Sequence, residues 1–142
     1  MIRKYTEKDI LPMVELENEV FCSSLGMAFY HRDLSNPLAC HWVLIENGVF
    51  IGFISSIFDG VSAEILNFCI KPDFQRQTNG SRLFEFYLNY LQKKQAETIV
   101  LEVRKSNRAA RAFYDKYGFK CIRIRKNYYQ EEDALFLQKN IR

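Results

Sequence analysis

The chain is predicted to fold as an α+β sandwich, in which a mixed, mostly antiparallel sheet of six to seven strands carries helices on both faces. Short β-branched and aromatic runs separated by tight-turn dipeptides fill its middle, and amphipathic helical patterns lie before and after them. With 142 residues, 48% of them hydrophobic, the chain is long enough for one domain, 1–142, with its own core.

Composition also excludes several functions. The net charge of +3 is too small for a protein that binds mainly by neutralising phosphates, so no direct nucleic-acid partner is expected. The N-terminus is charged where a signal peptide would be apolar, and the apolar run at 49–58 is too short to span a membrane. Four scattered cysteines and two histidines show no ligand spacing. We expect a cytoplasmic protein without a metal, whose thiols are free and mostly buried.

The first third of the chain predicts two helices. Thr6 and Asp9 have the spacing of a capping box, and apolar residues follow them at helical spacing. Pro12 then falls in the first turn, where its missing N–H costs nothing. The stretch 21–37 has no clear period and is expected to hold a short second helix and a loop.

Three antiparallel strands are predicted next, at about 41–46, 49–58 and 62–70. Asn47-Gly48 and Asp59-Gly60 separate them, and both dipeptides favour hairpin turns. The adjacent Cys40 and His41 would point to opposite faces of a strand, which argues against a nucleophile–base pair. A polar loop at 73–80 then leads to a helical pattern over 83–91.

The last third predicts strand, helix and two strands. The segment 98–103 is apolar on both faces except at Glu102, which is typical of a buried strand and makes it a parallel partner of 62–70. Asn107 is a candidate cap for the following helix, and Gly118 a candidate stop. The apolar face of that helix is Ala109, Ala110, Phe113, Tyr114 and Tyr117. Strands at about 119–125 and 134–139 complete the sheet.

Three features could carry chemistry. The loop at 71–80 joins the end of a strand to the start of a helix, where backbone N–H groups favour an anion, although its composition alone favours a plain solvated loop. Glu102 on a buried strand must be paired or protonated, which suits either a general base or a structural ion pair with Arg104 or Lys105. Tyr114 is either a proton donor or a core aromatic.

Taken together, these segments resemble the GNAT family of N-acetyltransferases, in its ribosomal-protein-alanine branch. The resemblance covers 65–129 and rests on three motifs: Leu66-Asn-Phe-Cys-Ile-Lys-Pro-Asp-Phe-Gln-Arg-Gln-Thr-Asn-Gly80; Leu101-Glu-Val-Arg-Lys-Ser-Asn107 followed by Ala-x-x-Phe-Tyr-x-x-x-Gly-Phe119; and Arg125-Lys-Asn-Tyr-Tyr129. It implies a GNAT fold with the parallel pair splayed to admit acetyl-CoA.

The resemblance assigns roles to residues. Glu102 matches the general base, and Tyr114 matches the acid that protonates the leaving thiolate. The pantetheine arm would pair with the strand backbone and contact a side chain after the next strand, and the pyrophosphate would bind the loop amides. These cofactor positions are Phe68, Cys69, Ile70, Arg76, Gln77, Thr78, Asn79, Gly80, Ser81 and Asn107. Thr78 stands where the family usually has a glycine, at a position that can need a positive φ.

The acceptor implied by the resemblance is the N-terminal alanine of a small-subunit ribosomal protein, bound by a monomer or weak dimer. Two acidic clusters could attract such a basic N-terminus or could be solvated surface: Glu15, Glu17 and Glu19, and Glu131, Glu132 and Asp133. Lysine or a small-molecule amine is the alternative acceptor. A catalytically weak acyl-CoA-binding module is the alternative to an enzyme.

Overall fold

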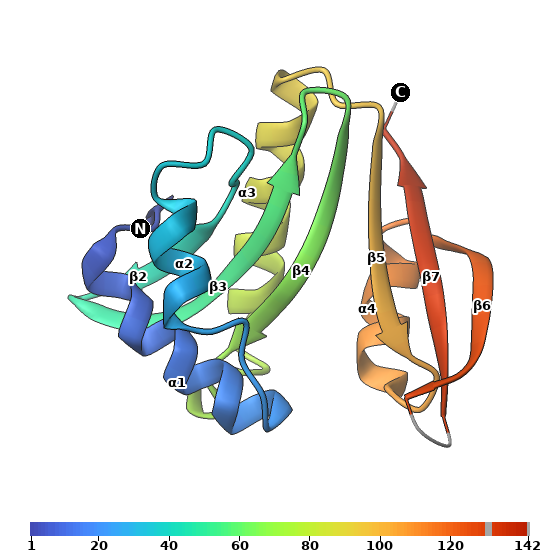
Figure 1. Cartoon of the computed structure of the whole chain (residues 1–142), viewed down its shortest axis with the longest axis horizontal. Helices are drawn as coiled ribbons and strands as arrows, with labels where there is room; N and C mark the ends of the chain where they lie inside the picture. Colours follow the sequence, from blue (N-terminus) through green and yellow to red (C-terminus); the bar gives the residue numbers. More distant parts are fainter. Residues whose placement is uncertain (130–131, 142) are drawn as a thin grey trace.

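Seven strands form one mixed sheet in the order β1-β2-β3-β4-β5-β7-β6 (Figure 1). The computed structural model describes residues 1–129 and 132–141. The strands are β1 (Ile2–Lys4), β2 (Trp42–Glu46), β3 (Val49–Phe58), β4 (Ser62–Ile70), β5 (Thr98–Arg104), β6 (Lys120–Tyr129) and β7 (Glu132–Asn140). The helices are α1 (Ile10–Phe21), α2 (Met27–Asp33), α3 (Asn79–Lys93) and α4 (Arg108–Lys116).

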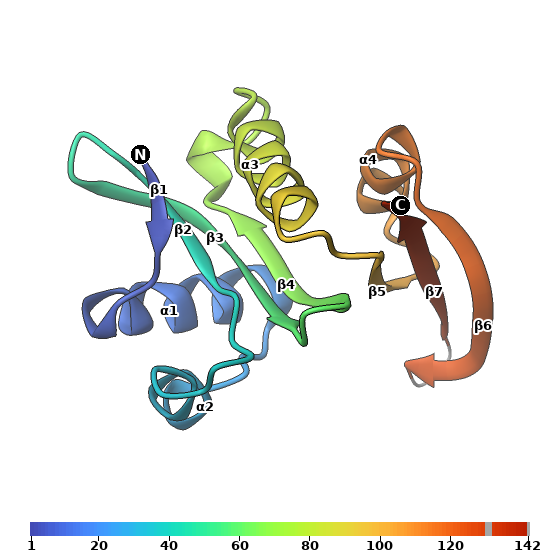
Figure 2. The same cartoon turned by 90° about the horizontal axis from the view of Figure 1, so that it is seen from above.

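The predicted fold class is confirmed. The β4–β5 pair is parallel, and the other five pairs in the sheet are antiparallel. Helices α1 and α2 cover one face of the sheet, and α3 and α4 cover the other (Figure 2). The pattern did not predict β1, a three-residue edge strand paired with β2. It also placed the start of α3 too late, because Asn79 and Gly80 already belong to its first turn.

Local signals set the ends of the helices as expected. The predicted capping box forms, with the Thr6 N–H donating to Asp9 Oδ2 at 2.7 Å, but it begins a short 3₁₀ helix, Glu7–Asp9, that leads into α1. At the start of α4, Asn107 Oδ1 accepts from the Ala110 N–H at 3.1 Å. Gly118 follows α4 with φ +88°, the left-handed conformation that ends many helices.

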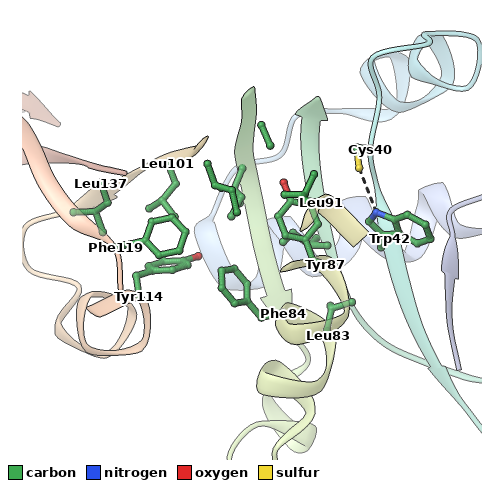
Figure 3. Close-up of a cluster of buried hydrophobic side chains, with 14 of the residues drawn as sticks. Cys40, Trp42, Leu83, Phe84, Tyr87, Leu91, Leu101, Tyr114, Phe119 and Leu137 are labelled. Atoms are coloured by element: carbon green, nitrogen blue, oxygen red, sulfur yellow. Dashed lines mark hydrogen bonds between the residues drawn. The ribbon is translucent and has the colours of Figure 1, made fainter. Parts of the chain in front are cut away.

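The face under α3 and α4 holds a core rich in aromatic rings. Phe84 is fully buried, and its ring lies within 5.7 Å of the rings of Phe68, Phe113 and Tyr114. Figure 3 shows these layers extending from Trp42 on β2 to Leu137 on β7. One residue of the predicted apolar face of α4 was wrong: Ala109 is exposed, because it points away from this core.

The face under α1 and α2 is different, because it buries several polar groups beside its apolar side chains. Glu17 is 0% exposed, and His41 and Asp33 form a buried pair with 2.7 Å between Nε2 and Oδ2. The opposite orientation of Cys40 and His41 is confirmed, since Cys40 belongs to the α3–α4 core. All four thiols are free, but Cys22 and Cys121 are exposed, so the expectation of mostly buried thiols was only half right.

Strand β4 carries a bulge that changes its direction. Ser55 on β3 pairs with Asn67 and Ser56 pairs with Ile65, so Leu66 is an extra residue on β4. Before the bulge, Ile65 faces the α3–α4 core; after it, Cys69 faces the α1–α2 core. Pairing with β5 ends at the same point, where Ile65 meets Leu101.

Candidate active site

The two parallel strands separate at their C-terminal ends. β4 and β5 pair from Ser62 with Thr98 to Ile65 with Leu101, and beyond that they diverge (Figure 1). Phe68, Cys69 and Ile70 pair with β3 on one side, and within the described residues no strand pairs with them on the other side. An extended ligand could therefore add to this edge through backbone hydrogen bonds, in the crevice where α/β proteins bind ligands.

The loop after β4 is held in a defined shape. Gln75 Nε2 donates to the Ile70 carbonyl at 2.9 Å, and Asn79 Nδ2 donates to the Phe74 carbonyl at 3.0 Å. Arg76 and Thr78 both have positive φ, 62° and 66°. Alternating left-handed residues turn successive N–H groups to one side, which makes an anion-binding concavity. The N-terminus of the fifteen-residue helix α3 follows directly and adds its own N–H groups.

Thr78 adopts the conformation for which a glycine would be expected. Its φ of 66° confirms that this position needs the left-handed region. A β-branched residue there costs about 1 kcal/mol or more. Gly80, two residues later, faces Ile70 and Phe68 of β4 at ordinary van der Waals distance, since a Cβ there would lie 3.8 Å from their side-chain atoms. Thr78 therefore adds strain to the loop at the position where a glycine would add none.

Tyr114 enters this region from α4. Its side chain is 7% exposed and packs against Phe84 and Phe119. Burial raises the pKa of its hydroxyl, and a charge on the nearby Cys69 would raise it further. Figure 3 shows the hydroxyl pointing toward β4. The phenol therefore stays protonated at neutral pH and can act as a hydrogen-bond or proton donor.

Glu102 reaches the crevice from the other face of the sheet. Leu101 and Val103 are buried in the α3–α4 core, so Glu102 between them points to the opposite face, where Phe136 is its cross-strand neighbour. The expectation of full burial was wrong, because Glu102 is half-buried. The structure thus places Glu102 and Tyr114 at the same opening but on opposite faces.

One residue of the two acidic clusters, Glu17, is not available to attract an acceptor. Glu17 is fully buried and is hydrogen-bonded inside the protein, so only Glu15 and Glu19 of the first cluster are exposed. In the second, Glu132 accepts from the Ser106 N–H at 2.6 Å, and Asp133 accepts from the Asn127 N–H at 3.0 Å. Both carboxylates therefore form hydrogen bonds that stabilise the β6–β7 end. Glu131 lies outside the described residues.

Sequence reasoning missed the buried network around Glu17. Its partners include Asn67, the polar residue that immediately follows the bulge in an otherwise apolar stretch of β4. That break in the apolar pattern was the available signal. In the described part of the chain, no helix is long and apolar enough to cross a membrane.

Comparison with known proteins decides the family. A sequence model of the acetyltransferase (GNAT) family matches residues 10–119. The chain belongs to the GNAT acetyltransferase family. The predicted GNAT fold, with its acyltransferase activity and acetyl-CoA as donor, is thereby confirmed.

Several GNAT relatives are named for one activity. A Bacillus subtilis (strain 168) protein, named for alanine N-acetylation of ribosomal protein bS18, is 35% identical over 139 residues, which are 96% of this chain and 92% of that protein. The ribosomal protein bS18-alanine N-acetyltransferase of Escherichia coli (strain K12) is 39% identical over 91 residues, 64% of this chain and 62% of that protein.

Solved structures agree with this assignment of the fold. The crystal structure of the ribosomal-protein-S18-alanine N-acetyltransferase from Escherichia coli superposes with a TM-score of 0.91 at 28% identity, covering 99% of this chain and 93% of that chain. Ard1 from Thermoplasma volcanium gives a TM-score of 0.87 at 26% identity, covering 99% and 96%.

Proposed function

We propose that this GNAT enzyme acetylates the N-terminal α-amine of a protein, and that its acceptor is the N-terminal alanine of ribosomal protein bS18. The observation that carries the proposal is the 35% identity, over nearly the whole chain, to the Bacillus subtilis relative named for this activity. Such an acceptor places the reaction in the cytoplasm.

The chemistry of the amine supports an α-amine over a lysine. The acceptor must be neutral before it attacks the thioester. An α-amine has a pKa near 7.7–8.0 and lysine near 10.4, so deprotonating the α-amine at neutral pH costs roughly 3 kcal/mol less. A single half-buried carboxylate such as Glu102 can meet that smaller demand.

The residues of the crevice fit acetyl-CoA, which supplies the acetyl group as a thioester when bound. The backbone of Phe68, Cys69 and Ile70 would hold the pantetheine arm as an added strand. The loop from Arg76 through Gln77, Thr78, Asn79 and Gly80 to Ser81 would hold the pyrophosphate with its N–H groups and the start of α3. Asn107, an exposed residue at the start of α4, would contact the pantetheine from the other side.

We assign proton transfer to two residues. Glu102 accepts the proton of the attacking amine, directly or through water, and Tyr114 donates a proton to the departing sulfur. Their positions on opposite faces of the opening leave the space between them for the reacting groups. The amine attacks the acetyl carbon, the carbon–sulfur bond breaks, and no covalent intermediate forms on the protein.

Thiol release from acetyl-CoA tests this function. A peptide that begins Ala-Arg should be acetylated, and the same peptide with a blocked N-terminus and an internal lysine should not. Equal rates on the two peptides would refute the α-amine assignment.

Two substitutions test the proton-transfer roles. Glu102→Gln and Tyr114→Phe should each lower kcat about 10²- to 10⁴-fold while acetyl-CoA still binds. Glu97→Gln, an exposed glutamate just before β5, is the matched control and should leave kcat unchanged. If either test variant turns over like the control, the role assigned to that residue is wrong.

A further inference from the structure

Glu17 is a charged side chain with no contact to water. It lies on α1 at 0% exposure and points at the sheet. Oε1 accepts from Ser24 Oγ at 2.6 Å and from the Leu25 N–H at 3.3 Å. Oε2 accepts from the Tyr30 hydroxyl at 2.6 Å and from Asn67 Nδ2 at 2.5 Å. Each carboxylate oxygen therefore has two donors, which together fill the group's capacity as an acceptor.

These donors come from three separate parts of the fold. Ser24 and Leu25 belong to the loop between α1 and α2, Tyr30 belongs to α2, and Asn67 belongs to β4. The loop has little regular structure of its own: Cys22 and Gly26 at its ends have φ of 57° and 100°. The Glu17 carboxylate therefore fixes the loop relative to β4.

The β4 partner lies at the opening of the site. Asn67 comes directly after the bulge, where β4 leaves β5, and one residue before the edge that would hold the pantetheine. The side chain of Glu17 thus joins the loop to the part of β4 that carries the site. None of its four donors belongs to the loop at 71–80.

Holding the loop to β4 with a buried carboxylate costs free energy, because the carboxylate loses its hydration. Within the described residues Glu17 forms no ion pair, so neutral donors alone offset the loss of hydration. An apolar side chain of similar size would pack there without that cost. Unlike an apolar side chain, the carboxylate accepts directional hydrogen bonds from the loop and from β4 at the same time, and these fix the position of the loop.

We propose that Glu17 is a positioning residue for the acceptor, which holds the α1–α2 loop against the opening of β4 so that the incoming N-terminus meets the thioester. This rests on the proposed function: Glu102, the proposed base, lies on the face of the sheet that α1 and α2 cover, so the acceptor amine approaches from that side. Because the cofactor loop is not tied to Glu17, acceptor binding should depend on the carboxylate and acetyl-CoA binding should not.

Glu17→Gln is the first test. The amide keeps the size of the side chain but turns an NH₂ group toward Asn67, so two donors face each other. We expect KM for the Ala-Arg peptide to rise about tenfold or more, the equivalent of one lost hydrogen bond to a charged group, and KM for acetyl-CoA to stay within about twofold.

Asp33→Asn is the matched control. Asp33 is also a buried acid of the α1–α2 face, but its side-chain hydrogen bonds go to His41 and Asn36, which lie outside the α1–α2 loop. It should lower the thermal midpoint of unfolding without separating the two KM values. If Asp33→Asn raises the peptide KM as much as Glu17→Gln does, the effect is general destabilisation and the proposal is wrong.

A reversal of polarity gives a sharper test. Asn67→Asp alone would place a second carboxylate beside Glu17 and should also raise the peptide KM. In the double variant, Glu17→Gln with Asn67→Asp, the amide donates to the new carboxylate. The hydrogen bond between the two positions is then restored with donor and acceptor exchanged. The peptide KM should return to within about threefold of the wild type. A double variant that is worse than both single variants would overturn the proposal.

Ser24→Ala provides a variant that threatens folding least, since Ser24 is only half-buried. It removes one loop donor and should raise the peptide KM less than Glu17→Gln does. Hydrogen exchange provides a readout without activity: the Leu25 and Gly26 N–H groups, which donate to Glu17 and Ser24, should exchange faster in Glu17→Gln but not in Asp33→Asn. If these N–H groups exchange in Glu17→Gln at the wild-type rate, Glu17 does not hold the loop and the proposal is wrong. Wild-type turnover on the peptide tests the proposed function separately.

Discussion

The two faces of the sheet are held in different ways. Under α3 and α4, rings such as Phe84, Phe113 and Tyr114 pack against one another, and their attraction is large but weakly directional. Under α1 and α2, Glu17 and the pair of Asp33 and His41 add directional hydrogen bonds to a smaller apolar cluster. The α3–α4 face is thus held mainly by packing of rings, and the α1–α2 face also by a particular arrangement of hydrogen bonds.

The largest expected effect is the loss of packing on the α3–α4 face. Phe84→Ala would remove a fully buried ring that contacts rings on β4, α3 and α4, at a cost of about 3–5 kcal/mol in the free energy of unfolding. Phe21→Ala, at a ring 40% exposed, should cost less than about 0.5 kcal/mol. Urea unfolding measures both. Equal losses would contradict the assignment of the dominant core to this face.

A pair of tyrosines isolates the role of hydrogen bonding. Tyr30 and Tyr87 are both 0% exposed, but the Tyr30 hydroxyl contacts Glu17 and Ser55, whereas the Tyr87 hydroxyl is the only buried side-chain oxygen or nitrogen of the described residues without a hydrogen-bond partner. It lies near Ser56, whose hydroxyl donates to the Cys40 carbonyl instead.

Removing each hydroxyl should therefore have opposite consequences. Tyr30→Phe removes a donor to Glu17 Oε2 and the acceptor of the Ser55 hydroxyl, and should cost about 1–3 kcal/mol in the free energy of unfolding. Tyr87→Phe removes a group that burial penalises and should be neutral within about 0.5 kcal/mol or stabilising. Thermal unfolding of the two variants side by side gives the comparison. A larger cost for Tyr87→Phe would show that the faces do not differ in this respect.

The smallest effect is a dependence on pH that belongs to the α1–α2 face. His41 Nδ1 accepts from the Ser56 N–H at 3.0 Å, so Nε2 carries the proton that faces Asp33. Burial lowers the pKa of His41 below its ordinary value near 6.5, although Asp33 opposes the shift.

The folded protein therefore keeps His41 neutral at a pH where the unfolded chain binds a proton. Its contribution to stability is fully present above pH 6.5 and is lost as the pH falls through that value toward the lower folded pKa, by up to about 1.4 kcal/mol per pH unit. Urea unfolding at pH 7.5 and 5.5 should show this loss in the wild type. His41→Gln should show a smaller one, and an equal loss in both would assign the slope to other groups.

Much of the fold was predictable because its signals are local. The dipeptides Asn47-Gly48 and Asp59-Gly60 set the hairpins, Asn107 and Gly118 set the ends of α4, and the apolar patterns gave the strands between them. Glu102 and Tyr114 were found through the resemblance of whole motifs. Their arrival from opposite faces needed the register of β5 and β7 and the packing of α4, which no local signal carries.

Other parts were misjudged for identifiable reasons. Glu17 was grouped with Glu15 and Glu19 by spacing in the sequence, yet it lies four residues after the buried Met13 and so shares its side of α1. The helical spacing alone was therefore enough to predict that Glu17 is buried. Ala109 and the half-burial of Glu102 depend on how far β6 and α4 cover the sheet, which only the assembled structure shows.

The extra residue at Leu66 changes the parity of strand β4. Up to that point odd-numbered side chains belong to the aromatic core, as Ala63 and Ile65 do; after it the even-numbered ones do, as Phe68 and Ile70 do. Deleting Leu66 would leave these faces unchanged, because regular alternation from Ile65 would still place Asn67 and Cys69 under α1 and α2; it would remove only the bulge at which β4 leaves β5. The extra residue therefore acts on the course of β4, and through it on the opening between β4 and β5, while the division of side chains between the two faces does not depend on it.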